Sequence, residues 1–285
     1  MPDVNQAPRS KARVLFSSHQ LAVESDPMAS GLRHWSARLG IVLLFVALPA
    51  PPACAAQVLV AVAANFADVI EKLRPSFERT SGHTLKVTSG SSGQLYALIK
   101  RGAPFHVLLS ADAATPARLL MERAAVQGTG FTYCLGRLAL WSRAPGFIGV
   151  DGLATLKAGQ FRHLALAQPE LAPFGAAARE VLHATGLWDA VRPKLVYGQN
   201  VAQVFSMVAS GNAELGFVAL TSLRAARPAA AGSTWEVPVN LYAPIRQDAV
   251  LLAGGEGNAG AVAFLDALKA PALRRQLESF GCGFD

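Results

Sequence analysis

From Gln57 onward, short runs of apolar residues alternate with longer segments whose apolar residues recur every three or four positions. Residues 58–64 (VLVAVAA) are continuously apolar, which predicts a strand that is covered on both faces. The next segment has the apolar spacing of one helical face, made by Phe66, Val69, Ile70, Leu73 and Phe77. Strands that alternate with helices in this way predict an α/β fold with mainly parallel sheets flanked by helices.

The alternating pattern occurs in two groups, which predicts two lobes. The expected strands are residues 58–64, 84–87 and 105–109 in the first group, and 164–167, 194–196 and 215–218 in the second. Residues 138–141 and 249–252 are also apolar, and we expect them to be hinge strands that cross between the lobes. Helices in residues 261–280 should return to the first lobe. We therefore assign residues 57–137 plus 247–285 to lobe I and residues 138–246 to lobe II.

Residues 1–56 have the features of an N-terminal extension followed by an export signal. Residues 39–50 (LGIVLLFVALPA) form an apolar run that follows Arg33 and Arg38, and small residues come next at 53–56. A positive segment, a short apolar core and small residues at the cleavage site are typical of a secretory signal peptide. The run is too short for a membrane span, which needs about 20 residues. We expect cleavage near residues 55–56 and a periplasmic protein.

The polar residues 1–27 fit no part of such a signal, and Met28 begins a segment of normal signal length. We therefore expect Met28 to be the true start. Export implies an oxidising compartment, where Cys134 and Cys282 could pair. The alternative is two buried free thiols, and the sequence leaves both possibilities open.

Four of the expected strand exits are small and neutral, and each precedes a helix. They are residues 64–65, 91–93, 173–175 and 200–201, and none of them contains Lys or Arg. The start of a helix offers unpaired N–H groups and a partial positive charge, so it binds anions without a cationic side chain. Capping or turn formation also explains each loop when it is taken alone. Together, the four loops favour an anion site between two lobes.

The chain lacks the patterns of several other functions. It is 52% hydrophobic and only 16% charged, which excludes a disordered protein. The net charge of +7 comes without a dense Lys/Arg cluster beyond residue 56, so we expect no nucleic-acid partner. Residues 90–93 (GSSG) do not match G-x-S-x-G, and neither nucleotide-binding glycine motif is present. The histidines are not spaced as a metal pair. We expect no catalysis, no cofactor and no directly coordinated metal cation.

Four ordered segments give the chain a specific resemblance. They are residues 60–73 (VAVAANFADVIEKL), 89–105 (SGSSGQLYALIKRGAPF), 108–112 (LLSAD) and 197–220 (YGQNVAQVFSMVASGNAELGFVAL). With them, the chain resembles the periplasmic molybdate-binding proteins of bacterial ABC molybdate/tungstate transporters. The resemblance implies a two-lobed solute-binding protein that closes on a tetrahedral oxyanion, molybdate or tungstate, in which the metal is bound only as its oxyanion.

The same resemblance implies that both lobes donate hydrogen bonds to the anion. The implied donors are Asn65, the backbone of Ala64, the hydroxyl and N–H of Ser92, and the N–H groups of Phe174 and Val201. Ala219 stands where some members of the family have a tyrosine, whose hydroxyl is therefore missing here.

The predicted function is capture of molybdate or tungstate and its delivery to an ABC permease in the inner membrane, by a protein that we expect to be a monomer. Two alternatives stay open. The same fold could bind another anion, such as sulfate, phosphate or a small organic acid. Alternatively, an exported hydrolase could use Ser92 as its nucleophile.

Overall fold

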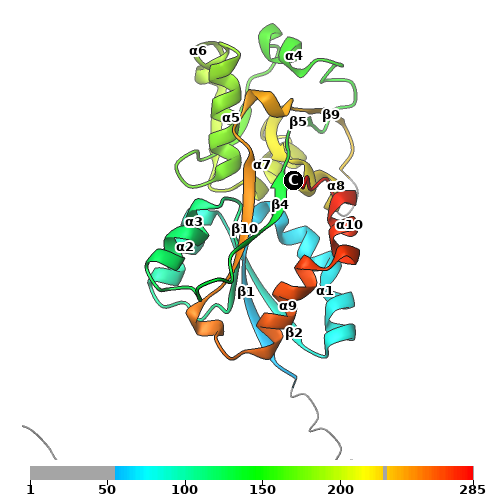
Figure 1. Ribbon diagram of the computed structural model, residues 1–285. Helices are drawn as coiled ribbons and strands as arrows, with labels where there is room; N and C mark the ends of the chain where they lie inside the picture. The colour runs from blue at the N-terminus through cyan, green and yellow to red at the C-terminus, as the bar shows by residue number, and fades with distance from the viewer. Residues whose placement is uncertain (1–54, 227–229, 285) are drawn as a thin grey trace, which may run out of the picture. The chain divides into compact units, whose positions relative to one another are not determined.

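The computed structural model describes residues 55–226 and 230–284, which contain two five-stranded sheets (Figure 1). The first sheet has the strand order β2 (Thr84–Gly90), β1 (Gln57–Ala63), β3 (Val107–Leu109), β10 (Ile245–Leu251) and β4 (Phe131–Gly136). The second sheet has the order β7 (Leu195–Gly198), β6 (Leu164–Ala167), β8 (Leu215–Ala219), β5 (Leu138–Ser142) and β9 (Ser233–Glu236). This architecture confirms the predicted two-lobed α/β fold.

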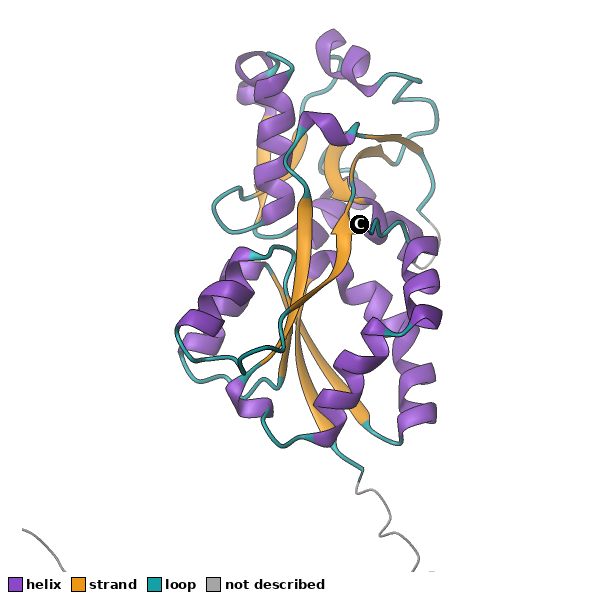
Figure 2. Cartoon of the chain, viewed as in Figure 1, coloured by secondary structure: helices purple, strands orange, loops and turns teal. Residues whose placement is uncertain are grey.

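Helices flank each sheet, as Figure 2 shows. The first sheet is accompanied by α1 (Ala67–Ser81), α2 (Ser92–Lys100), α3 (Ala114–Met121), α9 (Ala259–Lys269) and α10 (Pro271–Ser279), and together they are called lobe I. The second sheet is accompanied by α4 (Gly152–Ala158), α5 (Pro173–Ala184), α6 (Trp188–Val191), α7 (Val201–Ser210) and α8 (Leu220–Ala225), and together they are called lobe II. The boundaries deduced from the sequence, at residues 137/138 and 246/247, remain our proposal for where the lobes divide.

Strand β1 shows why lobe I needs helices on both faces of its sheet. Val60 and Val62 pack in the same cluster as α1 and α9, whereas Ala61, between them, packs in the cluster that holds α2 and α3. Successive side chains of a strand point to opposite faces, so a continuously apolar strand requires cover on both. Helix α1 supplies this cover with its apolar stripe and ends at Gly82, whose φ of 72° is the left-handed conformation that glycine adopts easily.

The two sheets are mixed rather than mainly parallel in their pairing. In lobe I, β1 pairs in parallel with β2 and β3, but β10 runs antiparallel to both β3 and β4. In lobe II, β6 pairs in parallel with β7 and β8, but β5 runs antiparallel to β8 and β9. The reversed strand in each sheet is the one that arrives from the other lobe, so its direction follows from the crossing.

The chain passes between the sheets at two points. Strand β4 leads into β5 through Arg137 alone, and a longer connection with a 3-10 helix (Val239–Leu241) leads from β9 to β10. The two strands that we expected to cross, β5 and β10, therefore begin directly after these crossing points. Figure 1 shows β4 and β10 side by side where the chain passes from one lobe to the other.

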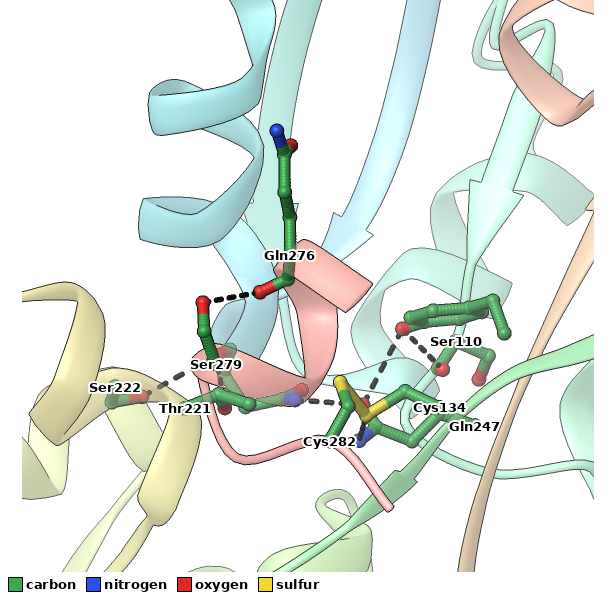
Figure 3. Close-up of a disulfide and its surroundings, with 10 residues drawn as sticks. Ser110, Cys134, Thr221, Ser222, Gln247, Gln276, Ser279 and Cys282 are labelled. Atoms are coloured by element: carbon green, nitrogen blue, oxygen red, sulfur yellow. Dashed lines mark hydrogen bonds between the residues drawn. A yellow bond between two sulfur atoms is a disulfide. The ribbon is translucent and has the colours of Figure 1, made fainter. Parts of the chain in front are cut away.

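A disulfide joins Cys134 of β4 to Cys282, which follows α10 (Figure 3). Next to it, Leu135 and Gly283 exchange two backbone hydrogen bonds of 2.8 Å. The C-terminal segment thus packs on the first sheet, and the disulfide answers the question that the sequence left open, whether the two cysteines pair. The bond joins residues 148 positions apart, which should restrict the unfolded chain strongly.

The predicted export signal and the predicted start at Met28 lie outside the described residues, of which Ala55 is the first. Within residues 55–226 and 230–284, no helix combines the length and the apolar character that crossing a membrane requires.

We predict that Cys282→Ser lowers the free energy of unfolding by about 2–5 kcal/mol, because the unfolded chain regains the freedom that the disulfide removes. Urea denaturation of the exported protein, with and without a thiol reductant, measures this effect. The reductant should destabilise the wild-type protein by a similar amount and leave Cys282→Ser unchanged. A wild-type protein that is insensitive to reductant after full reduction would contradict the prediction.

Candidate functional site

A small cavity of about 10 Å³ lies where strand exits of lobe I meet helix starts of lobe II. Its lining is formed by Ala63, Ala64, Asn65, Gly90, Ser91, Ser92, Ala111, Ala172, Pro173, Phe174, Asn200 and Val201. Five of the six residues singled out from the sequence are in this set. The sixth, Ala219, is fully buried at the end of β8 and is not among these lining residues.

Helix α2 leaves one N–H group of its first turn unpaired, and it belongs to Ser92. Ser91 caps the helix, because its hydroxyl accepts from the N–H of Gln94. The backbone carbonyl of Ser91 accepts from the N–H of Leu95. The N–H of Gly93 donates to the carbonyl of Leu171. In the described part of the chain, only the Ser92 N–H of this turn has no partner, and Ser92 lines the cavity.

Helix α5 likewise leaves one N–H group of its first turn unpaired, and it belongs to Phe174. The sequence predicted a turn at residues 173–175, but the helix already begins at Pro173, which fits a first helical position and has no N–H. The N–H groups of Gly175 and Ala176 both donate to the carbonyl of Ala172. The Phe174 N–H has no partner among the described residues.

Gly175 sets how closely this helix start approaches β6. A Cβ at this position would overlap the carbonyl oxygen of Ala167, the last residue of β6. Only glycine therefore lets α5 begin so close to the strand end. This close approach places the neighbouring Phe174 N–H at the cavity.

Helix α7 repeats the arrangement with an asparagine cap. The side-chain oxygen of Asn200 accepts from the N–H of Gln203 at 3.0 Å, and the backbone carbonyl of Asn200 accepts from the N–H of Val204 at 3.3 Å. The N–H groups of Val201 and Ala202 have no partner among the described residues, and Val201 lines the cavity. Three helices from two lobes therefore direct an unpaired N–H at one small space.

The hydroxyl of Ser92 is held so that it can donate a hydrogen bond into the cavity. Its oxygen accepts from the Ala111 N–H at 3.0 Å and from the Ser110 hydroxyl at 3.0 Å, and the Ser110 oxygen accepts from the Asp112 N–H at 3.4 Å. A hydroxyl has one proton and two acceptor positions, so both acceptor positions of Ser92 are occupied and its proton is left for the cavity. A chain of hydrogen bonds also polarises its members.

Asn65 is buried at the cavity wall with 1% of its surface exposed. Its Nδ2 donates to Oε1 of Gln247 at 2.7 Å, and its backbone carbonyl accepts from Thr221 Oγ1 at 3.0 Å and Ser222 Oγ at 3.4 Å. Its Oδ1 is buried and has no hydrogen-bond partner in the described part of the chain. An unsatisfied acceptor of this kind costs about 1–3 kcal/mol and needs a donor such as a bound water, because a deprotonated oxyanion can only accept.

Hydrogen bonds also connect the two lobes around the cavity. On one side, the Gly93 N–H donates to Leu171, and Gln94 Nε2 donates to Gln199 Oε1 at 3.1 Å. On the other side, the hydroxyl of Thr221 in α8 reaches the carbonyl of Asn65. These contacts enclose the cavity between the lobes.

The cavity has no ionisable side chain among its lining residues. Its charge complement for an anion comes instead from the N-termini of α2, α5 and α7, each equivalent to about half a positive charge. Neutral N–H and O–H groups that are fixed around a small space can bind an anion and select it by size.

The geometry does not favour a serine hydrolase. In the described residues, the Ser92 hydroxyl contacts Ser110 and the Ala111 N–H, and neither is a base that could take its proton. His106 lies apart from Ser92, where its Nδ1 accepts from the Leu59 N–H at 3.2 Å. The described ranges 55–226 and 230–284 also hold no cluster of three or more His, Cys, Asp or Glu that could bind a metal ion.

Sequence reasoning missed the residues that support the donors. Ser110 supports Ser92, Gln247 supports Asn65, and Thr221 holds the Asn65 carbonyl. For Gln247 a signal was present, because its alternation with Ile245 and Ala249 places it on the apolar face of a strand. Asp112, which precedes α3, accepts from the Thr115 N–H in the first turn of that helix.

Comparison with known proteins shows what the chain is similar to. Residues 58–282 match the family described as bacterial extracellular solute-binding protein. The molybdate-binding protein ModA of Azotobacter vinelandii is 45% identical over 85% of this chain and 96% of its own length. The ModA of Rhodobacter capsulatus is 44% identical over 81% of this chain and 89% of its own length. A solved structure of the Azotobacter vinelandii periplasmic molybdate-binding protein superimposes with a TM-score of 0.76 and 37% identity, over 80% of this chain and 99% of that one.

We predict that Ser91→Ala lowers the free energy of unfolding by about 0.5–2 kcal/mol, because α2 loses its capping hydroxyl. Urea denaturation measures the change. Ser206→Ala, an exposed serine within α7, is the matched control and should stay within about 0.5 kcal/mol of the wild type. Equal stability of both variants would show that Ser91 does not cap α2.

Proposed function

This chain belongs to the bacterial extracellular solute-binding protein family. From that premise, we propose that it is a molybdate-binding transport protein. We further propose that it holds its oxyanion in the cavity between its two lobes. The main support for this ligand position is that the backbone N–H groups of Ser92, Phe174 and Val201 are unpaired and belong to residues that line the cavity. Asn65, the Ser92 hydroxyl and the backbone of Ala64 complete the proposed donor set.

Hydrogen-bond energetics support this proposal. A dianion that leaves water loses a large hydration energy, which only charge-assisted hydrogen bonds can replace in a site without cations. Each such bond contributes about 1.5–3 kcal/mol, and micromolar affinity corresponds to about 8 kcal/mol after the costs of association. Several preorganised donors therefore suffice for tight binding.

The absence of ionisable lining residues implies selection by size. Molybdate and tungstate are nearly equal in size, so we expect both to bind. Sulfate is smaller, and donors fixed for the longer metal–oxygen bonds would bind it poorly. Binding should favour the closed arrangement, because the donors come from both lobes.

We place the protein in the periplasm, where it would deliver its anion to an ABC permease without catalysing a reaction. The disulfide between Cys134 and Cys282 supports an oxidising compartment. The predicted signal peptide supports the same destination. A monomer that releases its cargo to the permease is the simplest arrangement consistent with one cavity between two lobes.

Isothermal titration of the exported protein with molybdate, tungstate, sulfate and phosphate tests the function. Saturable binding of one molybdate or tungstate per chain, with no response to sulfate or phosphate, is the expected result. Preference for sulfate or phosphate would show that the protein binds that anion and would contradict the proposed molybdate function. Covalent labelling of Ser92 by a fluorophosphonate probe would instead support the alternative function of a serine hydrolase.

We predict that Ser92→Ala and Asn65→Ala each weaken molybdate binding by about 1–3 kcal/mol, which is about 5- to 150-fold, because each removes a donor from the anion. The same titration measures both affinities. Ser206→Ala should bind with wild-type affinity. Unchanged isotherms in both site variants would contradict the assignment of the site.

A further inference from the structure

Gln247 is a fully buried amide whose two ends are both occupied (Figure 3). Its Oε1 accepts from Asn65 Nδ2 at 2.7 Å, and its Nε2 donates to the sulfur of Cys134 at 3.3 Å. Gln247 does not line the cavity, but Asn65 does. It therefore lies one hydrogen bond behind the site, between the cavity and the disulfide.

The surroundings of Gln247 determine which end of its amide faces Asn65. The hydroxyl of Tyr133 donates to the carbonyl of Ser110 at 3.0 Å and reaches Gln247 Oε1 at 3.4 Å. Burial raises the pKa of Tyr133 well above its ordinary value, so the hydroxyl stays protonated and remains a donor. The single proton of that hydroxyl goes to Ser110, so the orientation of Gln247 is set by its other two partners: its carbonyl end accepts from Asn65 Nδ2, and its NH₂ end faces a disulfide sulfur, which can only accept.

This orientation fixes Asn65 in turn. An asparagine can present either its NH₂ group or its carbonyl to a ligand, and a carbonyl pointed at an anion would repel it. Reversal of the Asn65 amide would place its Oδ1 against Gln247 Oε1, which would oppose two acceptors in a buried space. Gln247 therefore holds the Nδ2 end of Asn65 in place, and the second N–H of Nδ2 stays free to donate.

Gly136 of β4 leaves room for this arrangement. A Cβ at this position would lie 2.8 Å from Gln247 Nε2 and 2.9 Å from the ring of Phe174. The Gln247 amide and the Phe174 ring of lobe II thus both approach the backbone where the chain is about to cross between lobes.

We propose that Gln247 is a positioning residue for oxyanion binding, which acts through Asn65 by fixing the donor end of its amide. This inference rests on the proposed function, since it concerns the affinity of the same site. It predicts that loss of the Gln247 carbonyl weakens binding only as long as Asn65 is present.

A double-mutant cycle tests this coupling in the exported protein. Titration with molybdate compares the wild type, Gln247→Leu, Asn65→Ala and the double variant. We expect Gln247→Leu to weaken binding about tenfold in the wild-type background and to cause no further loss in the Asn65→Ala background. Gln247→Met, with an unbranched side chain of similar length, serves as a second variant if Gln247→Leu does not fold.

Thr132→Val is the matched control, because it removes a 2.7 Å hydrogen bond to Asp248 between the same two strands without contact to Asn65. It should retain wild-type affinity. Equal losses from the Gln247 substitution in both backgrounds, or no loss in either, would overturn the positioning role while leaving the proposed function intact. A wild-type protein that does not bind molybdate would overturn both.

Discussion

Burying an anion without a cationic side chain requires hydrogen-bond donors that nothing else in the protein uses. In this chain, the first turns of α2, α5 and α7 satisfy most of their N–H groups internally, by the Ser91 and Asn200 caps, by the carbonyl of Ala172 and by contact with Leu171. Each helix still presents one unpaired N–H to the same cavity. The proposed anion site therefore depends on how three helices begin, and changes to the helix caps should affect it as well as changes to its lining.

The topology explains why these helix starts meet. In each sheet, the parallel strands end on the side that faces the other lobe, and residues after β1, β2, β3, β6 and β7 line the cavity. Ligands of open α/β sheets characteristically bind at this edge. The chain crosses between the lobes just before the reversed strands β5 and β10, and these two crossings connect the sheets.

Much of this arrangement could be predicted from the sequence, because it depends on local patterns. Apolar runs predicted most strands, and neutral residues before helical segments marked the four loops, within which the family resemblance implied Asn65, Ser92, Phe174 and Val201 as donors. The pairing of Cys134 with Cys282 could not be predicted, since it depends on which distant segments meet. The direction of β5 and β10 also depends on the crossings rather than on periodicity.

The supporting residues were hard to find for the same reason. Ser110 lies in the LLSAD segment and Gln247 in no quoted segment, but the roles of both arise from contacts across 18 and 182 positions of sequence, respectively. The sequence signal for Gln247 is its place as a polar residue on an apolar strand face. Buried polar groups of this kind must find partners, so they indicate three-dimensional contacts even where the sequence cannot name the partner.

The most direct test of the central claim is anomalous diffraction from crystals of the protein with tungstate, whose heavy atom can be located without bias. The account predicts a single strong tungsten peak in the cavity, with oxygens about 2.7–3.2 Å from the backbone nitrogens of Ser92, Phe174 and Val201. A peak elsewhere in the molecule, or one in the cavity whose oxygens do not contact these three nitrogens, would contradict it.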